Sequence, residues 1–153
     1  MKGWRGARPG AAGTPHILCV EPELRERRVF ERIVTPYAGR VPANGRWQLT
    51  FRPCVQSAVP VLRCQTVAVV LCESRTVSGT WREMLETLDL LNDRPLLIVT
   101  SRIADESLWA EALNLGAYDV LAKPYDAVEV DRIVGWACSH WLEHRQRYRA
   151  AAG

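Results

Sequence analysis

Five short apolar runs alternate with longer amphipathic segments along this chain. Four of them, at residues 16–20, 67–72, 95–100 and 120–122, are continuously apolar, which is typical of strands buried on both faces of a parallel sheet. The run at 47–51 alternates between apolar and polar residues, and this pattern predicts a strand buried on one face only. We therefore expect five strands.

The segments that follow these runs carry apolar residues at helical spacing. They predict helices near 21–38, 54–64, 81–91, 105–115 and 126–148. Pro60 lies in the middle of the second helix, so we expect that helix to be kinked or shortened. Thr80 precedes the third helix with Glu83 three residues later, which is the spacing of a capping box.

Strands that alternate with helices through short loops predict an α/β domain, in which a parallel sheet is covered on both faces. In the helix near 105–115, Leu108, Ala112 and Leu115 are expected to face the core. We expect three parts: a disordered basic arm at 1–15, the domain at 16–137, and a basic extension of the last helix at 138–153.

Composition narrows the class of protein. With 48% hydrophobic and 24% charged residues, the chain resembles an ordinary globular domain, and no apolar run approaches the ~20 residues of a membrane span. The first fifteen residues lack the apolar core of a secretory signal. The five cysteines are an odd number without a CxxC pair, and Cys19 and Cys72 lie inside apolar runs, which favours a reducing cytoplasm over a disulfide scaffold. A net charge of +3 is weak evidence for a nucleic-acid partner.

One lysine stands out among the charged residues. The chain has twenty Lys and Arg residues, and only Lys2 and Lys123 are lysines. Gly116 supplies a helix cap and Pro124 ends the following strand, so Lys123 is expected at the carboxyl edge of the sheet, where α/β folds build their sites. A solvated lysine before a loop proline is the alternative interpretation.

The segment at 116–125, GAYDVLAKPY, resembles the fifth-strand signature of the response-regulator receiver domain. The resemblance covers roughly residues 16–136. It implies a flavodoxin-like (βα)5 fold, a doubly wound parallel sheet with strand order 2-1-3-4-5. It also implies an acceptor aspartate that takes a phosphoryl group from a histidine kinase, with Thr100 and Lys123 contacting that group.

The acidic residues depart from the pattern of that family. After the first strand the family has consecutive acids that hold Mg²⁺, whereas here Pro22 separates Glu21 from Glu23. These two glutamates are the expected metal ligands, and they would bind Mg²⁺ only weakly because Pro22 offers no ligand. A pair of carboxylates that compensates the helix dipole is the simpler interpretation. We expect no other cofactor.

The acceptor position carries Glu73 in place of aspartate. Residues 1–88 contain no aspartate at all, so the alignment leaves little freedom. A misplacement of ~1 Å can cost ~100-fold in such a site, and the longer side chain therefore predicts little or no phosphorylation. Two interpretations stay open: Glu73 is a fixed negative charge that resembles the phosphorylated state, or it is a remnant that only pairs with Lys123.

The expected output surface also departs from the pattern of the receiver family. Three residues before Lys123 the family has an aromatic switch residue, and here that position is Val120. An interaction surface is predicted on the fourth helix, the fifth strand and the last helix, comprising Trp109, Tyr118, Val120, Tyr125, Trp136 and Trp141. Of the two tryptophans on the last helix, simple packing on the sheet is the more natural role for Trp136. A homodimer through this helix is a further expectation.

His140, Glu143 and His144 match the HxxEH pattern of inverted zinc peptidases. Those enzymes need a third ligand far downstream, and the nine residues after His144 contain no Asp, Glu, His or Cys. We interpret the match as coincidental.

The resemblance thus predicts a stand-alone pseudo-receiver in two-component signalling. It would not be an enzyme, and it would act in the cytoplasm by binding a histidine kinase or a downstream protein, with no membrane contact. A divergent receiver that still accepts a phosphoryl group with Mg²⁺ is the alternative. A nucleic-acid adaptor that uses the arginine-rich ends is a third hypothesis.

Overall fold

A computed structural model describes residues 15–37 and 47–153. Five parallel strands form one sheet in the order β2-β1-β3-β4-β5. They are β1 (His16–Val20), β2 (Gln48–Arg52), β3 (Val69–Glu73), β4 (Leu96–Ser101) and β5 (Asp119–Ala122). The predicted fold class and strand order are both confirmed.

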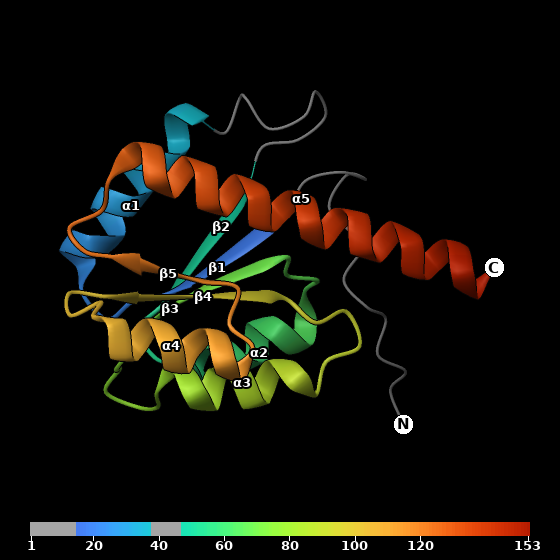
Figure 1. Cartoon of the computed structure of the whole chain (residues 1–153), viewed down its shortest axis with the longest axis horizontal. Helices are drawn as coiled ribbons and strands as arrows, with labels where there is room; N and C mark the ends of the chain where they lie inside the picture. Colours follow the sequence, from blue (N-terminus) through green and yellow to red (C-terminus); the bar gives the residue numbers. More distant parts are fainter. Residues whose placement is uncertain (1–14, 38–46) are drawn as a thin grey trace.

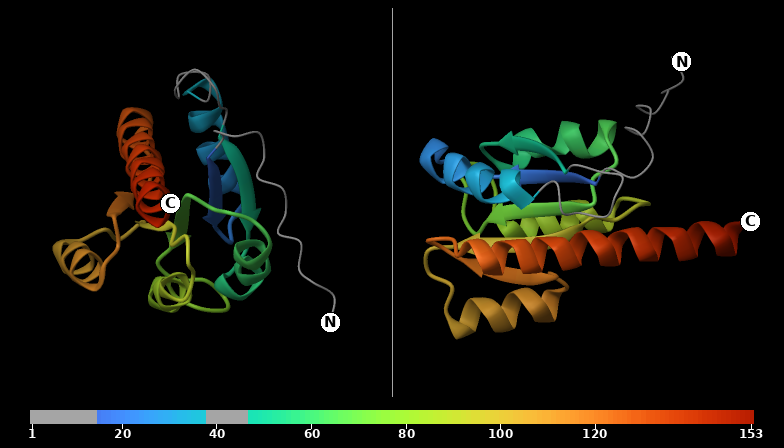
Figure 2. Two further views of the ribbon diagram at one scale, coloured as in Figure 1. Left: turned by 90° about the vertical axis from the view of Figure 1, so that its right-hand side faces the viewer. Right: turned by 90° about the horizontal axis from the view of Figure 1, so that it is seen from above.

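Helices cover the sheet on both faces (Figure 1). They are α1 (Leu24–Tyr37), α2 (Val55–Cys64), α3 (Trp81–Asp89), α4 (Glu106–Leu115) and α5 (Ala127–Ala152). Helices α1 and α5 lie on one face, while α2, α3 and α4 lie on the other (Figure 2). Two clusters of buried apolar side chains fill the two layers, and alternate residues of the central strands belong to each.

The helix ends follow from local side-chain chemistry in part. The Asp105 side chain accepts a hydrogen bond from the Leu108 backbone N–H at 2.9 Å, which starts α4, and Gly116 ends it in the left-handed conformation with φ 109°. Thr80 does precede α3 as predicted, but its side chain makes no capping hydrogen bond. Helix α2 runs through Pro60 to Cys64, so the proline does not shorten it.

Two expectations about the helices need correction. Leu115 was expected to face the core, but its side chain is exposed because α4 packs at the edge of the sheet, beside β5, where Ala112 is its buried residue. The last helix was expected to end near residue 148, but α5 continues to Ala152 and projects past the sheet (Figure 2). No helix in the described part of the chain is both long and apolar enough to span a membrane. Residues 1–14 of the predicted arm, and residue 38 at the predicted end of the first helix, lie outside the described residues.

Candidate functional site

The carboxyl ends of four strands bring the candidate residues together at one edge of the sheet. Glu21 directly follows β1, Glu73 ends β3, and Lys123 directly follows β5. In the register of β3 and β4, Glu73 lies opposite Thr100. The Lys123 backbone N–H donates to the Ser101 carbonyl oxygen at 2.9 Å, which fixes the start of its side chain beside β4.

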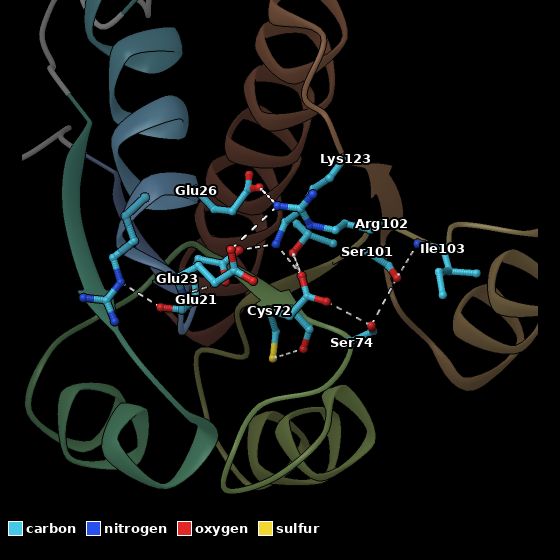
Figure 3. A network of polar contacts seen from close by, with 12 residues as sticks. Glu21, Glu23, Glu26, Cys72, Ser74, Ser101, Arg102, Ile103 and Lys123 are labelled. Carbon is cyan, nitrogen blue, oxygen red and sulfur yellow. Dashed lines mark hydrogen bonds and ion pairs between the residues drawn. The ribbon is translucent and has the colours of Figure 1, made fainter.

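Lys123 forms ion pairs with two glutamates at once (Figure 3). Its Nζ contacts Oε1 of Glu21 and Oε2 of Glu73. The Lys123 and Glu21 side chains are each 3% exposed, and Glu73 is mostly buried. The compact ammonium is therefore enclosed by carboxylates rather than presented to solvent.

Burial and charge act in opposite directions on these groups. Burial by itself lowers the pKa of Lys123, but the hydrogen bonds and negative charges of Glu21 and Glu73 outweigh it and hold the pKa above the usual value of a lysine. Burial raises the pKa of Glu21, and Lys123 offsets that rise only in part. The ammonium thus stays charged at neutral pH, where it compensates two carboxylates.

Three hydroxyl groups complete this hydrogen-bond network. Thr100 Oγ1 lies 3.5 Å from Glu73 Oε2, and Ser74 Oγ donates to Glu73 Oε1 at 3.2 Å. Ser101 Oγ lies 3.2 Å from Ser74 Oγ and accepts from the Ile103 backbone N–H at 3.1 Å. Thr100 was predicted from the sequence, but Ser74 and Ser101 were not, although they directly follow Glu73 and Thr100.

A second ion pair, also missed, lies beside the first (Figure 3). Arg102, in the loop after β4, contacts the carboxylate of Glu26 on α1 and lies 3.7 Å from Glu23. Glu26 is buried, so its carboxylate depends on Arg102 for compensation. Glu23 consequently faces an arginine and not the Lys123 ammonium.

A magnesium ion, which the resemblance implies, does not fit these side chains as they stand. Both oxygens of Glu21 have partners: Oε1 contacts Lys123, and Oε2 accepts from the Glu23 backbone N–H at 3.2 Å. Both oxygens of Glu73 are likewise engaged, by Ser74 and Lys123. Pro22 contributes no ligand. Among the described residues, no group of three or more His, Cys, Asp or Glu side chains is arranged to hold a metal ion.

The network lies in an open cavity of about 540 Å³. The cavity reaches from the sheet edge to the space between α3 and α4, and its lining includes Glu21, Glu73, Lys123, Ser101, Trp81 and Leu108. This volume is within the range of small-ligand sites. Small molecules in solvent therefore have access to Glu73.

The residues of the predicted interaction surface are not all on the surface. Trp136 is 58% exposed, whereas Trp141 is 6% exposed and packs in the core under the Arg145 guanidinium. The expectation that Trp136 rather than Trp141 packs on the sheet is wrong, because position 141 falls on the buried stripe of α5 that begins at Val130 and position 136 does not. Val120 is fully buried as well and cannot contribute to a surface.

The other three aromatic residues are partly buried. Tyr118 donates to or accepts from His140 Nδ1 at 2.6 Å, which links β5 to α5. Tyr125 packs edge-on against Phe30 of α1, and burial raises its pKa. Trp109 packs against the core cluster on the opposite face of the sheet. His140 therefore forms both a hydrogen bond and an edge-on ring contact with Tyr118.

Comparison with known proteins supports the resemblance. No model of a known protein family matches the chain. The regulatory protein VirG of Agrobacterium fabrum is 27% identical over 126 residues, which cover 81% of this chain and 47% of VirG. VirG of Rhizobium radiobacter is 28% identical over 74% of this chain and 40% of its own length. The chain thus spans about half the length of these relatives or less.

Solved structures of receiver domains superpose on this fold. The signal receiver domain of an HD domain-containing protein from Pseudomonas fluorescens gives a TM-score of 0.72 at 21% identity, covering 85% of this chain and 98% of that one. A CheY-like response-regulator receiver domain protein from Methanospirillum hungatei gives 0.70 at 13% identity, covering 86% and 98%. The resemblance predicted from the sequence is therefore confirmed, and this chain has the fold of a response-regulator receiver domain.

Proposed function

We propose that this chain is a pseudo-receiver in two-component signalling, which acts through protein–protein contacts with little or no phosphorylation. The observation that carries the proposal is the contact between Lys123 and Glu73. In a working receiver the lysine neutralises the transferring phosphoryl group. Here a carboxylate from the acceptor position already occupies that ammonium.

The contact with Lys123 agrees with both interpretations of Glu73, and we favour the first because the Thr100 hydroxyl also approaches the same carboxylate oxygen. The extra methylene of glutamate lets the carboxylate reach Lys123, while Thr100 lies 3.5 Å from the same oxygen. A phosphoryl group on a shorter acceptor would need these two partners. Glu73 therefore acts as a fixed negative charge that takes the place of the phosphoryl group, and the domain remains in one signalling state.

Phosphorylation by a small donor tests the proposal. The full chain is incubated with acetyl phosphate and Mg²⁺, and its intact mass is measured. We expect no phosphoryl adduct on the natural chain. We expect an adduct on the double variant Glu73→Asp with Pro22→Asp, which restores a shorter acceptor and an additional metal ligand. Circular dichroism shows whether the variant is folded.

The open cavity favours a second candidate function, a divergent receiver that still accepts a phosphoryl group. A small donor can reach Glu73 from this side. An adduct on the natural chain that requires Mg²⁺ and disappears in Glu73→Gln would establish this second function and would refute the first.

The expected partner is another protein, either a histidine kinase or a downstream signalling protein. Exposed Trp136 and the contact between Tyr118 and His140 lie on the same side of the domain, along β5 and α5, and provide a mixed aromatic surface for it. A homodimer through α5 is an alternative use of this surface. The relatives named VirG are regulatory proteins, which agrees with a role in regulation.

A further inference from the structure

The exposed side of α1 carries an arginine stripe, which we define as Leu24, Arg25, Arg28 and Arg32. The spacing of the arginines, i, i+3 and i+7, places them on one helical face over about 10.5 Å. All three are exposed, and Leu24, at the start of the helix, is 63% exposed. Within the described residues none of the three arginines forms an ion pair.

The exposed side of α3 carries an acidic stripe, which we define as Glu83, Glu86 and Leu90. These residues have the same i, i+3 and i+7 spacing, and they also extend over about 10.5 Å. Both glutamates are exposed without an ion pair among the described residues, and Leu90 is 86% exposed at the end of the helix. The stripe faces away from the sheet, because Trp81 and Met84 lie on the opposite, buried side of α3.

Several neighbouring charged residues on the same helices have partners within the chain, and exposed Glu31 on α1 is one of them. On α3, Arg82 contacts Glu111 and Asp89 contacts Arg94 at 2.7 Å. On α1, Glu26 is engaged by Arg102. The two stripes therefore keep like charges side by side on one helix, an arrangement that weakens an isolated helix unless opposite charges approach it.

The two stripes cannot meet within one molecule. Helix α1 lies above the sheet and α3 lies below it in the view of Figure 1. They can meet between two copies that stack with the α1 layer of one on the α3 layer of the next. If the helices run antiparallel, Arg32 faces Glu83, Arg28 faces Glu86, and Leu24 faces Leu90. In this arrangement each arginine lies opposite a glutamate, and the two exposed leucines lie opposite each other.

We propose that the arginine stripe is a docking surface for the acidic stripe of a second copy of this chain. The contact is heterologous, because each copy uses a different surface, and it repeats along a row of copies. It is separate from the surface along β5 and α5, and it does not depend on the state of Glu73. The contact is electrostatic in large part, so it weakens as salt screens the exposed charges.

Charge reversal with complementation tests the proposal. Sedimentation velocity of the full chain is measured at low salt, with protein concentrations up to about 1 mM. At these concentrations, contacts with millimolar dissociation constants become detectable. We expect the average mass of the natural chain to rise with concentration. Arg28→Glu and Glu86→Arg should each remain monomeric. An equimolar mixture of the two should regain association, because the arginine stripe is unchanged in Glu86→Arg and the acidic stripe is unchanged in Arg28→Glu, so these two natural stripes can meet, and the two changed stripes also carry opposite charges.

Matched controls carry the same change of net charge elsewhere. Arg147→Glu and Glu143→Arg lie on the exposed part of α5, away from both stripes. They should associate like the natural chain, and association should fall when salt rises from about 0.05 M to about 0.5 M.

Three results would each overturn the proposal. The first is a natural chain that stays monomeric at low salt throughout this range. The second is equal loss of association in the controls, which would indicate net charge rather than the stripes. The third is a mixture of the two reversed variants that does not associate.

Discussion

Lys123 and Glu21 are 102 positions apart in the sequence, and their side chains form an ion pair in which each is 3% exposed. A charge in such a place is costly unless an opposite charge and hydrogen bonds compensate it. Glu73 adds a second carboxylate to the same ammonium. The site therefore depends on Lys123 more than on either glutamate.

Replacing Lys123 with methionine should destabilise the fold by about 3–5 kcal/mol, because two carboxylates would then be left without a cation. Denaturant unfolding at neutral pH measures the change. Arg94→Met is the matched control: it removes an exposed ion pair with Asp89 and should cost about 1 kcal/mol or less. Equal losses in the two variants would contradict the account.

The free energy of unfolding of the natural chain should fall as pH rises into the alkaline range. The folded pKa of Lys123 lies above its usual value of about 10.4, so its contribution is complete below that pH and is lost as pH rises through the folded pKa. Urea unfolding between about pH 9 and about pH 11.5 measures this loss in the natural chain.

Lys123→Met should move the pH-dependent loss of stability from the alkaline range to the acidic and neutral range. Without the ammonium, burial and the charge of Glu73 both hold the pKa of Glu21 above its usual value. A carboxyl with a raised folded pKa stabilises the fold at acidic pH and stops doing so as pH rises through that pKa. The variant should therefore be more stable near pH 4 than near pH 7, and the opposite order would count against a buried site.

The two tryptophans of α5 should respond differently to truncation. Trp141→Ala should destabilise the domain by about 3–5 kcal/mol because it removes a buried side chain from the core. Trp136→Ala should cost less than about 1 kcal/mol, because that side chain is mostly exposed. Thermal or denaturant unfolding of both variants checks the burial assigned here.

Three glycines should give three different results on replacement by alanine. Gly79 has φ 104°, and an added Cβ would lie 2.7 Å from Val55 Cβ, so we expect a loss above about 1 kcal/mol. Gly116 has φ 109° with free space, so its loss should be smaller, near 1 kcal/mol. Gly135 lies inside α5 with no atom nearby, and alanine there should stabilise by about 0.5–1 kcal/mol.

The sequence was sufficient for the fold because the strands are short, apolar and regularly separated. It also placed Glu21, Glu73, Thr100 and Lys123 together, since parallel strands end at the same edge of the sheet. The expectation that Trp141 stays exposed was wrong although the pattern argued against it, because Trp141 continues the apolar stripe of α5 that begins at Val130. The sequence pattern also missed the pair of Arg102 and Glu26, which join across 76 positions of the chain.

The partner of Glu23 shows a further limit of the sequence pattern. Sequence spacing put Glu21 and Glu23 in one candidate metal site, whereas the structure directs Glu21 to Lys123 and Glu23 toward Arg102. The choice between these partners depends on side-chain directions at the start of α1. Those directions follow from tertiary packing rather than from local pattern.

The claim at the centre of this account is that Glu73 holds the Lys123 ammonium. The chain has only two lysines, so nitrogen NMR of lysine-labelled protein gives two ammonium signals to assign, with Lys123→Met identifying one of them. We predict that the Lys123 signal is protected from exchange with water and does not move when Mg²⁺ and fluoroberyllate are added. A signal that exchanges rapidly, or that shifts on this addition, would contradict the claim.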